Sequence, residues 1–154
     1  MAKKSAGILL YRLNQQVPEV LIVHPGGPYW VHKDSGAWSI PKGEFTGEEN
    51  PEAAAFREFE EETGFPVSGD LIPLSPVRLH SGKILFPFAY EGDFDPCLLK
   101  SNTFAMEWPP KSGKWKDFPE VDRAEWVDWP TARQKLSKEQ VAILEELALQ
   151  LNLQ

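Results

Sequence analysis

The chain has 154 residues, of which 42% are hydrophobic, 25% charged and 12% aromatic, which is ordinary for a folded protein and excludes a disordered one. The length suits one hydrophobic core, so we expect a single domain over residues 1–154. The formal net charge of −7 argues against tight nonspecific binding to a nucleic-acid polymer, because clustered lysine and arginine side chains carry such binding.

The N-terminal segment gives no indication of export. Lys3 and Lys4 precede only a brief apolar run, which is too short for the core of a signal peptide. No stretch elsewhere approaches the length needed to span a membrane. We therefore predict a cytoplasmic protein without a membrane partner, acting as a monomer or a homodimer.

The first predicted elements are strands. Residues 5–13 and 19–24 are rich in Ile, Val and Leu, and the polar NQQVP segment between them predicts a hairpin. A third short strand is expected at residues 37–40. The polar, glycine-containing residues 41–50 predict a loop.

A helix is predicted from Pro51 to Thr63. Asn50 supplies an N-cap amide, and proline at the first helical position loses no hydrogen bond there. Gly64 supplies a left-handed stop, and Pro66 prevents the helix from continuing. The segment thus carries both a start signal and a stop signal.

The second half of the chain is predicted to be less regular. Its expected elements are strands at 71–80, 83–91 and 124–129 and a helix over 137–151. Residues 93–119 contain several prolines and no sustained period, which predicts a long irregular segment that covers the functional site. This segment holds the only cysteine, Cys97, which excludes an internal disulfide bond and a zinc site built from several cysteines.

The last turns of the first predicted helix are unusually acidic. At about 100° per residue, Glu58, Glu61 and Glu62 fall on one face, while Glu60 points nearly opposite. Like charges at this spacing destabilise a helix by roughly 0.2–0.5 kcal/mol per pair, and the helix dipole adds a similar cost. Such a run is most often a solvated acidic face. Mg²⁺ or Mn²⁺, which prefer oxygen ligands, would instead supply the missing positive charge.

Residues 43–65, GEFTGEENPEAAAFREFEEETGF, resemble the Nudix box, G-x5-E-x7-R-E-U-x-E-E-x-G-U, where U is a bulky apolar residue. Agreement at its seven specified polar or glycine positions is far more specific than a short glycine motif. Phe59 and Phe65 occupy the apolar positions, and Phe59 is aromatic where aliphatic residues are commoner. The specified positions are filled by Gly43, Glu49, Arg57, Glu58, Glu61, Glu62 and Gly64.

The resemblance implies an α/β fold, an α/β/α sandwich around a mixed β-sheet, and metal-dependent hydrolysis of a nucleoside diphosphate linked to another moiety. It implies that Glu58, Glu61 and Glu62 hold the metal. Gly43 is expected at the same metal site. Catalytic roles are expected for Glu58, Glu61 and Arg57, with Arg57 and Glu49 supporting the ligands.

A further acid outside the box is expected to act as a metal ligand or a general base. Glu120 lies six residues before Trp126, and the family often places an extra glutamate at a similar offset before its late tryptophan strand. Glu120 is therefore favoured over Glu107. A plain loop acid is an equally weighted alternative for Glu120.

Candidate substrate-binding residues also lie outside the box. Lys42 immediately precedes it and is expected to contact a substrate phosphate. Lys83 and His80, together with Arg78, are weaker candidates on neighbouring strands, and a surface role is favoured for each. His24 and His32 have no partners at metal-ligand spacing, so structural roles are expected for both.

The tryptophans offer surfaces on which a nucleobase can stack. Trp30, Trp38, Trp108 and Trp115 are the candidates, although core packing is the favoured reading for Trp38. Trp126 and Trp129 are expected to pack in the core. These residues do not distinguish adenine from guanine.

The segment GAWSIPKGE resembles the W-x-x-P-K-G entrance of Nudix hydrolases that act on dinucleoside polyphosphates and diphosphoinositol polyphosphates. Few basic residues argue against a heavily phosphorylated inositol. The expected order of substrates is a dinucleoside polyphosphate, a nucleoside triphosphate and then a nucleotide sugar. A Nudix-fold nucleotide sensor without turnover and a scaffold with a merely solubilising acidic face are the alternatives.

Overall fold

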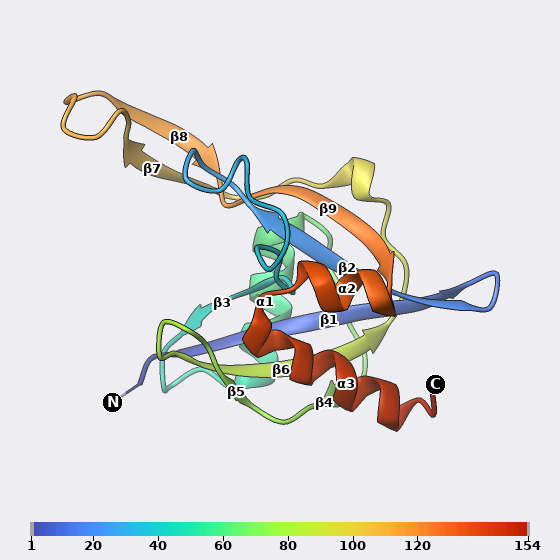
Figure 1. Cartoon of the computed structure of the whole chain (residues 1–154). Coiled ribbons are helices and arrows are strands. Elements are labelled where there is room, and N and C mark those ends of the chain that lie inside the picture. Colours follow the sequence, from blue (N-terminus) through green and yellow to red (C-terminus); the bar gives the residue numbers. More distant parts are fainter. Residues whose placement is uncertain (1, 154) are drawn as a thin grey trace.

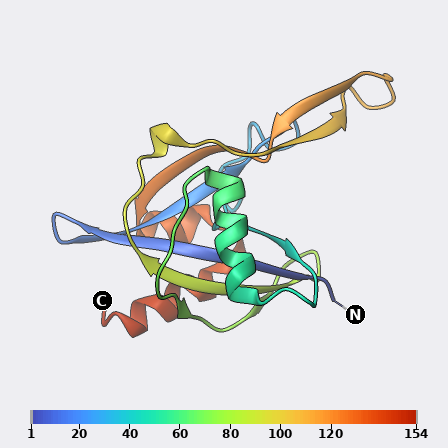
Figure 2. The same ribbon diagram turned by 180° about the vertical axis from the view of Figure 1, so that it is seen from behind.

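The computed structural model describes residues 2–153 and contains a twisted seven-stranded sheet with helices on both faces. In Figure 1, α2 (Trp129–Lys135) and α3 (Val141–Gln150) lie in front of the sheet. Figure 2 shows α1 (Pro51–Thr63) in front when the molecule is seen from behind. The three layers confirm the predicted α/β/α sandwich.

The sheet is organised around β1 (Lys4–Asn14). This strand pairs antiparallel with β2 (Val17–Pro25) and parallel with β6 (Ile84–Glu91). β9 (Val121–Asp128) pairs antiparallel with β2. Because one parallel pair lies among antiparallel pairs, the sheet is mixed, as predicted.

The predicted N-terminal hairpin is confirmed. Gln15 and Gln16 connect β1 and β2, with φ angles of 50° and 69°. Two-residue turns with positive φ at both positions match the right-handed twist of the strands they join. The hairpin therefore begins the sheet with a tight connection.

Neither prediction for residues 37–50 holds in full, although residues 46–50 form a loop as expected. Residues 37–40 make isolated bridges, and the strand β3 (Lys42–Phe45) lies where a loop was expected. β3 pairs with β1, where a Cβ added to Gly7 would lie 2.6 Å from the carbonyl oxygen of Pro41. β3 forms because its backbone pairs with β1, which is distant in sequence and approaches closely at Gly7. Local strand propensity does not reveal such a partner.

Residues 71–80 also depart from the prediction. They form two short strands, β4 (Ile72–Pro73) and β5 (Val77–Arg78), instead of one. Both short strands pair with β6. The observed range of β6, Ile84–Glu91, nearly matches the strand predicted at residues 83–91. The sheet edge is thus built from short pieces.

The segment predicted to be irregular, residues 93–119, contains regular structure. After a short 3-10 helix at Pro96–Leu98, β7 (Thr103–Glu107) and β8 (Trp115–Pro119) form a separate two-stranded sheet. The hairpin projects from the body of the protein and does not lie across α1 (Figure 1 and Figure 2). The expectation that this segment covers the functional site is therefore not met by the hairpin.

The core lies on both faces of the sheet. On β1, Leu9 faces the cluster beneath α2 and α3, while Ile8 and Leu10 face the cluster beneath α1. This alternation follows from the period of two in a strand. Phe59 is fully buried in the second cluster, so the aromatic residue in the Nudix-box resemblance is accommodated by packing.

The C-terminal region contains one helix more than predicted. Asp128 caps α2, since its Oδ1 accepts the Thr131 N–H at 2.9 Å. Within the predicted 137–151 helix, a 3-10 turn at Lys138–Gln140 precedes α3. The Ser137 side chain makes no capping hydrogen bond at the start of this turn. Among residues 2–153, none of the helices has the length and apolar character needed to cross a membrane.

Candidate functional site

The start of α1 is fixed as its sequence predicts. The Asn50 side chain accepts the backbone N–H of Glu52 at 2.8 Å and that of Ala53 at 3.3 Å. At the other end, Gly64 has a φ of 78°, and its N–H donates to the Glu60 carbonyl at 2.7 Å. Asn50 therefore caps the N-terminus of α1, and Gly64 ends the helix, as the sequence predicts.

A distant segment covers the C-terminus of α1. The N–H of Lys100 donates to the Thr63 carbonyl at 2.8 Å, and the N–H of Asn102 donates to the Glu61 carbonyl at 2.9 Å. A Cβ on Gly64 would lie 2.8 Å from the Lys100 backbone oxygen, so this close approach requires glycine. These contacts satisfy terminal carbonyls that the helix leaves without partners.

The acidic face of α1 lies against the sheet edge and is partly buried. Burial raises the pKa of Glu62 to about 8, Lys42 opposes this rise, and the charges of Glu120 and Glu58 add to it. Burial and then the charge of Glu61 raise the pKa values of Glu58 and Glu120. We call Glu58, Glu61, Glu62 and Glu120 the acidic cluster. Their mutual repulsion reflects their proximity.

The fourth glutamate of the helical run behaves differently. Glu60 is exposed, whereas Glu58 is only 7% exposed. The structure therefore separates Glu60 from the acidic cluster, in agreement with the predicted helical phase.

Arg57 holds several of these carboxylates. Its Nε and Nη2 donate to the two carboxylate oxygens of Glu49, each at 2.9 Å. Its Nη1 donates to Glu58 at 2.8 Å and to Glu61 at 3.2 Å. The paired Glu49 carboxylate, followed by Glu58, raises the pKa of Arg57. A bidentate guanidinium pair of this kind fixes orientation as well as charge.

Gly43 is required by a close approach of a side chain. A Cβ at this position would lie 1.8 Å from Oε2 of Glu58, so any other residue would displace that carboxylate. Gly47, four residues later, would meet no described atom within 4 Å. The predicted grouping of Gly43 with Glu58 therefore has a steric cause.

Lys42 adjoins the acidic cluster. Its backbone N–H donates to Oε1 of Glu62 at 3.1 Å. Burial lowers the pKa of its amine, while the charge of Glu62 opposes that change. A buried amine next to a carboxylate is suited to meeting the oxygens of an anionic ligand.

The two acids considered outside the helix have different surroundings. Glu120 lies where β8 meets β9; its N–H donates to the Asn102 carbonyl at 2.8 Å, and its carbonyl accepts the Gly26 N–H at 2.9 Å. The Glu107 carboxylate instead accepts backbone N–H groups of the β7–β8 turn. The structure brings Glu120 to the acidic cluster, and Glu107 stabilises the hairpin.

The acidic cluster offers donors suited to a divalent cation. Within residues 2–153, no three acidic, histidine or cysteine side chains are already arranged to enclose a metal ion. Arg57 occupies oxygens of Glu58 and Glu61. The other oxygens are hard donors on carboxylates that repel each other, and Mg²⁺ and Mn²⁺ bind such groups together with water and phosphate oxygens. The donor set therefore fits the cation that the sequence predicts.

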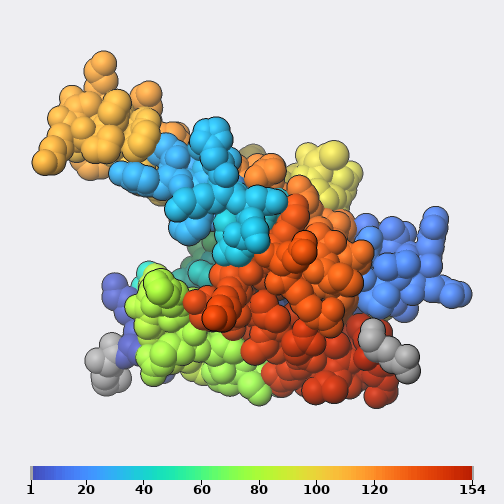
Figure 3. Space-filling model, viewed as in Figure 1, coloured from blue at the N-terminus to red at the C-terminus, as the bar shows by residue number. Residues whose placement is uncertain are grey.

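A recess of about 340 Å³ lies beside the acidic cluster, and Lys42 and His80 are among its lining residues. Figure 3 shows the hollow between residues 26–36, in sky blue, and the turn at residues 79–83, in light green. Trp38 is fully buried beneath it, and its indole N–H donates to Asp34 at 2.7 Å. Its ring thus leaves no exposed surface on which a base could stack.

The remaining predicted substrate contacts lie around the turn at residues 79–83. The Lys83 amine donates to the Glu44 carboxylate at 2.9 Å, and Arg78 donates to the Gly82 carbonyl at 3.1 Å. The His80 side chain is 98% exposed. Of these three residues, only His80 lines the recess.

His24 has the structural role that was expected. It is fully buried, and its ring nitrogens lie 2.8 Å from the Asp122 carboxylate and 2.7 Å from the Lys33 carbonyl. The side chain thereby ties residues 26–36 to β9. His24 positions one wall of the recess.

Two groups near the site were not singled out by the sequence. Lys100 and Asn102 border an open groove of about 460 Å³ that also exposes Glu61. Glu139 lines the recess although it lies more than 90 residues from Lys42. No local motif marks these residues, because each reaches the site through the fold.

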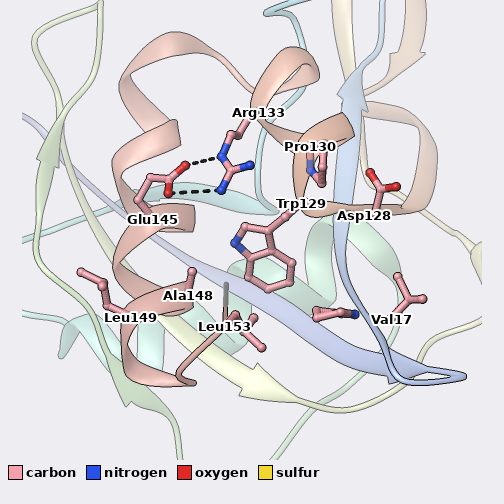
Figure 4. Close-up of a pocket in the computed structure, with 10 residues that line it drawn as sticks. Val17, Asp128, Trp129, Pro130, Arg133, Glu145, Ala148, Leu149 and Leu153 are labelled. Atoms are coloured by element: carbon pink, nitrogen blue, oxygen red, sulfur yellow. Dashed lines mark hydrogen bonds and ion pairs between the residues drawn. The ribbon is translucent and has the colours of Figure 1, made fainter.

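A third cavity, of about 450 Å³, is lined by residues of β2, α2 and α3, on the face of the sheet opposite α1. Figure 4 shows Trp129, Leu149 and Leu153 along it and the ion pair between Arg133 and Glu145 at its rim. Arg133 and Glu145 neutralise each other, and the carboxylate of the third charged lining residue, Asp128, caps α2 by accepting the Thr131 N–H. This groove lacks the excess of carboxylates found at α1.

Comparisons with known proteins agree with this geometry. The NUDIX domain model matches residues 1–147. The octanoyltransferase of Myxococcus xanthus is 36% identical over 101 residues, which is 66% of this chain and 25% of that protein. The chain thus spans about a quarter of the length of this curated relative.

Solved structures share the fold. The C. elegans Ap4A hydrolase in a binary complex superimposes with a TM-score of 0.67 at 18% identity, covering 97% of this chain and 98% of that one. The NUDIX domain of Shewanella oneidensis NrtR, complexed with ADP ribose, gives 0.66 at 17% identity, covering 98% and 89%. At these identities the likeness concerns the three-layer architecture.

Proposed function

Because this chain belongs to the NUDIX domain family, we propose that it is a pyrophosphohydrolase that cleaves a phosphoanhydride bond in a nucleoside diphosphate linked to another moiety. The observation that carries this proposal is the acidic cluster beside Gly43, with more carboxylates than Arg57 and Lys42 can neutralise. Such an excess suits a divalent cation and a polyphosphate bound together.

We assign Glu58, Glu61 and Glu62 to hold Mg²⁺ or Mn²⁺, with Glu120 as a further ligand or as the general base. When bound, the cation would neutralise charge on the diphosphate and make a water molecule more acidic. Arg57 keeps Glu58 and Glu61 in a fixed orientation through its hydrogen bonds. Gly43 leaves the space that the Glu58 carboxylate needs.

Two further roles follow from position. Glu120 is anchored by backbone hydrogen bonds, and its raised pKa makes its carboxylate a stronger base than an ordinary glutamate. The Lys42 amine is suited to hold a substrate phosphate at the end of the acidic cluster. The open groove bordered by Lys100 leaves room for the other half of a two-part substrate.

The favoured substrates are a dinucleoside polyphosphate and then a nucleoside triphosphate. The neighbours named as an Ap4A hydrolase and as an ADP ribose complex support a nucleotide ligand. A small-molecule nucleotide is thus the proposed partner.

The test is phosphate release from a nucleotide panel with Mg²⁺ or Mn²⁺. Glu61→Gln and Glu62→Gln should each lower kcat/KM by about 100-fold or more, in line with the loss of a general base or a metal ligand. Glu52→Gln, in the exposed first turn of the same helix, is the matched control and should retain activity. Full activity in folded Glu61→Gln would contradict the proposal. Tight nucleotide binding without turnover would support a sensor instead.

A further inference from the structure

The recess adjoins the proposed phosphate site at one residue. Lys42 lines the recess, and its backbone N–H contacts Glu62 of the acidic cluster. A group attached to a phosphate at Lys42 would therefore enter the space between residues 26–36 and the turn at residues 79–83. This inference rests on the proposed function and names the part of the substrate that fills the recess.

Among the candidate stacking tryptophans, Trp30 alone combines exposure with a place in the recess. It is 40% exposed and forms part of the lining. Trp38 is fully buried, Trp108 packs edge-on against Tyr29 with ring centroids 5.3 Å apart, and the 68% exposed Trp115 lies on the projecting hairpin.

The main chain at Trp30 is fixed by backbone hydrogen bonds, and a lysine amine lies against its ring. The Trp30 N–H donates to the Gly27 carbonyl at 3.3 Å, and the Trp30 carbonyl accepts the Lys33 N–H at 2.9 Å. The Lys33 amine also lies 5.0 Å from the ring centroid. An aromatic side chain on an ordered main chain loses less conformational entropy when a planar ring stacks on it than one on a mobile segment.

The polar groups of the recess determine which ring edge it can read. Gln140 is 2% exposed, and its side chain is occupied, accepting the Ile40 N–H and donating to the Ser39 hydroxyl, both at 3.0 Å. Glu139 is the one carboxylate among the described lining residues, and His80 Nδ1 lies 4.0 Å from it. An ionised carboxylate only accepts hydrogen bonds, and its two oxygens suit two parallel donors.

We propose that the recess is the nucleobase subsite, in which Trp30 stacks on the base and Glu139 accepts hydrogen bonds from its edge. Guanine offers a ring N–H beside an exocyclic amino group, which matches both oxygens of a carboxylate. Adenine has an amino group next to a ring nitrogen that only accepts. The subsite therefore favours guanine nucleotides over adenine nucleotides.

The test is calorimetric binding of GDP, ADP and inorganic pyrophosphate to the full chain with Mg²⁺. GDP should bind about 10-fold tighter than ADP, as expected for one extra hydrogen bond to a charged group. Trp30→Ala should weaken GDP and ADP by about 10-fold or more while leaving pyrophosphate unchanged. Trp30→Phe should restore most of the loss. Trp115→Ala is the matched control and should bind all three ligands like the unmodified chain.

A second variant tests the edge contact. Glu139→Gln should abolish the preference for GDP over ADP without changing pyrophosphate binding. Equal GDP binding by folded Trp30→Ala and the unmodified chain would overturn the subsite, and equal binding of GDP and ADP by the unmodified chain would overturn the role of Glu139. The expected binding pattern without any hydrolysis would refute the proposed function alone. Glutamate-dependent hydrolysis insensitive to Trp30→Ala would refute the subsite alone.

Discussion

The acidic cluster and the groove between α2 and α3 both join an arginine to glutamates, yet their charges are arranged differently. In the groove, Arg133 and Glu145 form a single exposed pair, and the Asp128 carboxylate caps the N-terminus of α2. At α1, Arg57 is shared among three glutamates, and Glu62 and Glu120 lie beyond its contacts in partly buried surroundings. The comparison shows that unpaired carboxylates mark a cavity as a candidate catalytic site. The volume of a cavity does not reveal whether its lining carries unpaired charges.

The largest expected effect comes from removing the space beside Glu58. Gly43→Ala would place a Cβ 1.8 Å from the Glu58 carboxylate and displace it, so kcat/KM with Mg²⁺ should fall by about 100-fold or more. Gly47→Ala lies in the same segment and meets no described atom within 4 Å, so it should retain activity. Equal activities in the two folded variants would show that the Glu58 position does not matter.

A smaller effect is expected from the arginine that orients the acids. Arg57→Ala leaves Glu49, Glu58 and Glu61 without their shared donor, and should reduce Mg²⁺ affinity or activity by about 10- to 100-fold. Arg133→Ala breaks an exposed pair and should change stability by no more than about 1 kcal/mol, with activity unchanged. Metal titration and thermal unfolding of both variants would measure this. A greater loss of activity in Arg133→Ala than in Arg57→Ala would contradict the proposal that the acidic cluster is the functional site.

The remaining effect concerns the pH dependence of stability in the metal-free protein. Glu62 has a pKa of about 8 in the folded protein against 4.5 in the unfolded chain, so it binds its proton more tightly when folded. This stabilisation is fully present below about pH 4.5 and is lost as the pH rises through about 8. Thermal unfolding without metal should show a midpoint that falls across this range.

The same measurement with Mg²⁺ sharpens the prediction. The cation binds ionised carboxylates, so its stabilising shift in the unfolding midpoint should grow as the pH rises. Glu62→Gln removes the titrating group and should flatten the pH dependence of the metal-free protein. A midpoint that rises with pH across the range in the unmodified metal-free chain, and is lowered by Glu62→Gln, would show that Glu62 is stabilising when ionised.

The sequence predicts those parts of the molecule whose information is local. Asn50 and Gly64 define α1, and the helical period separates Glu60 from the acidic face. Because the predicted ligands on α1 belong to one rigid element, their spacing in sequence translates directly into spacing in the structure. The N-terminal hairpin is predictable for the same reason.

The parts that could not be predicted depend on distant partners. β3 exists because β1 accepts it at the close approach over Gly7. The recess gathers Trp30, Lys42 and Glu139 from three separate segments, and no period or spacing in the sequence connects them. The β7–β8 hairpin pairs only with itself, and its prolines hide the strand pattern.

The hairpin β7–β8 leaves the body and returns to it at nearly the same point, since the Glu120 N–H reaches the Asn102 carbonyl at 2.8 Å. A segment closed at its base in this way can change in length at a small entropic cost, and its tip tolerates insertion. Peptide tags or reporter domains grafted between residues 109 and 114 would therefore stand clear of the three-layer body. The tip of the β7–β8 hairpin is thus a suitable site for immobilising the protein or fusing it to another domain.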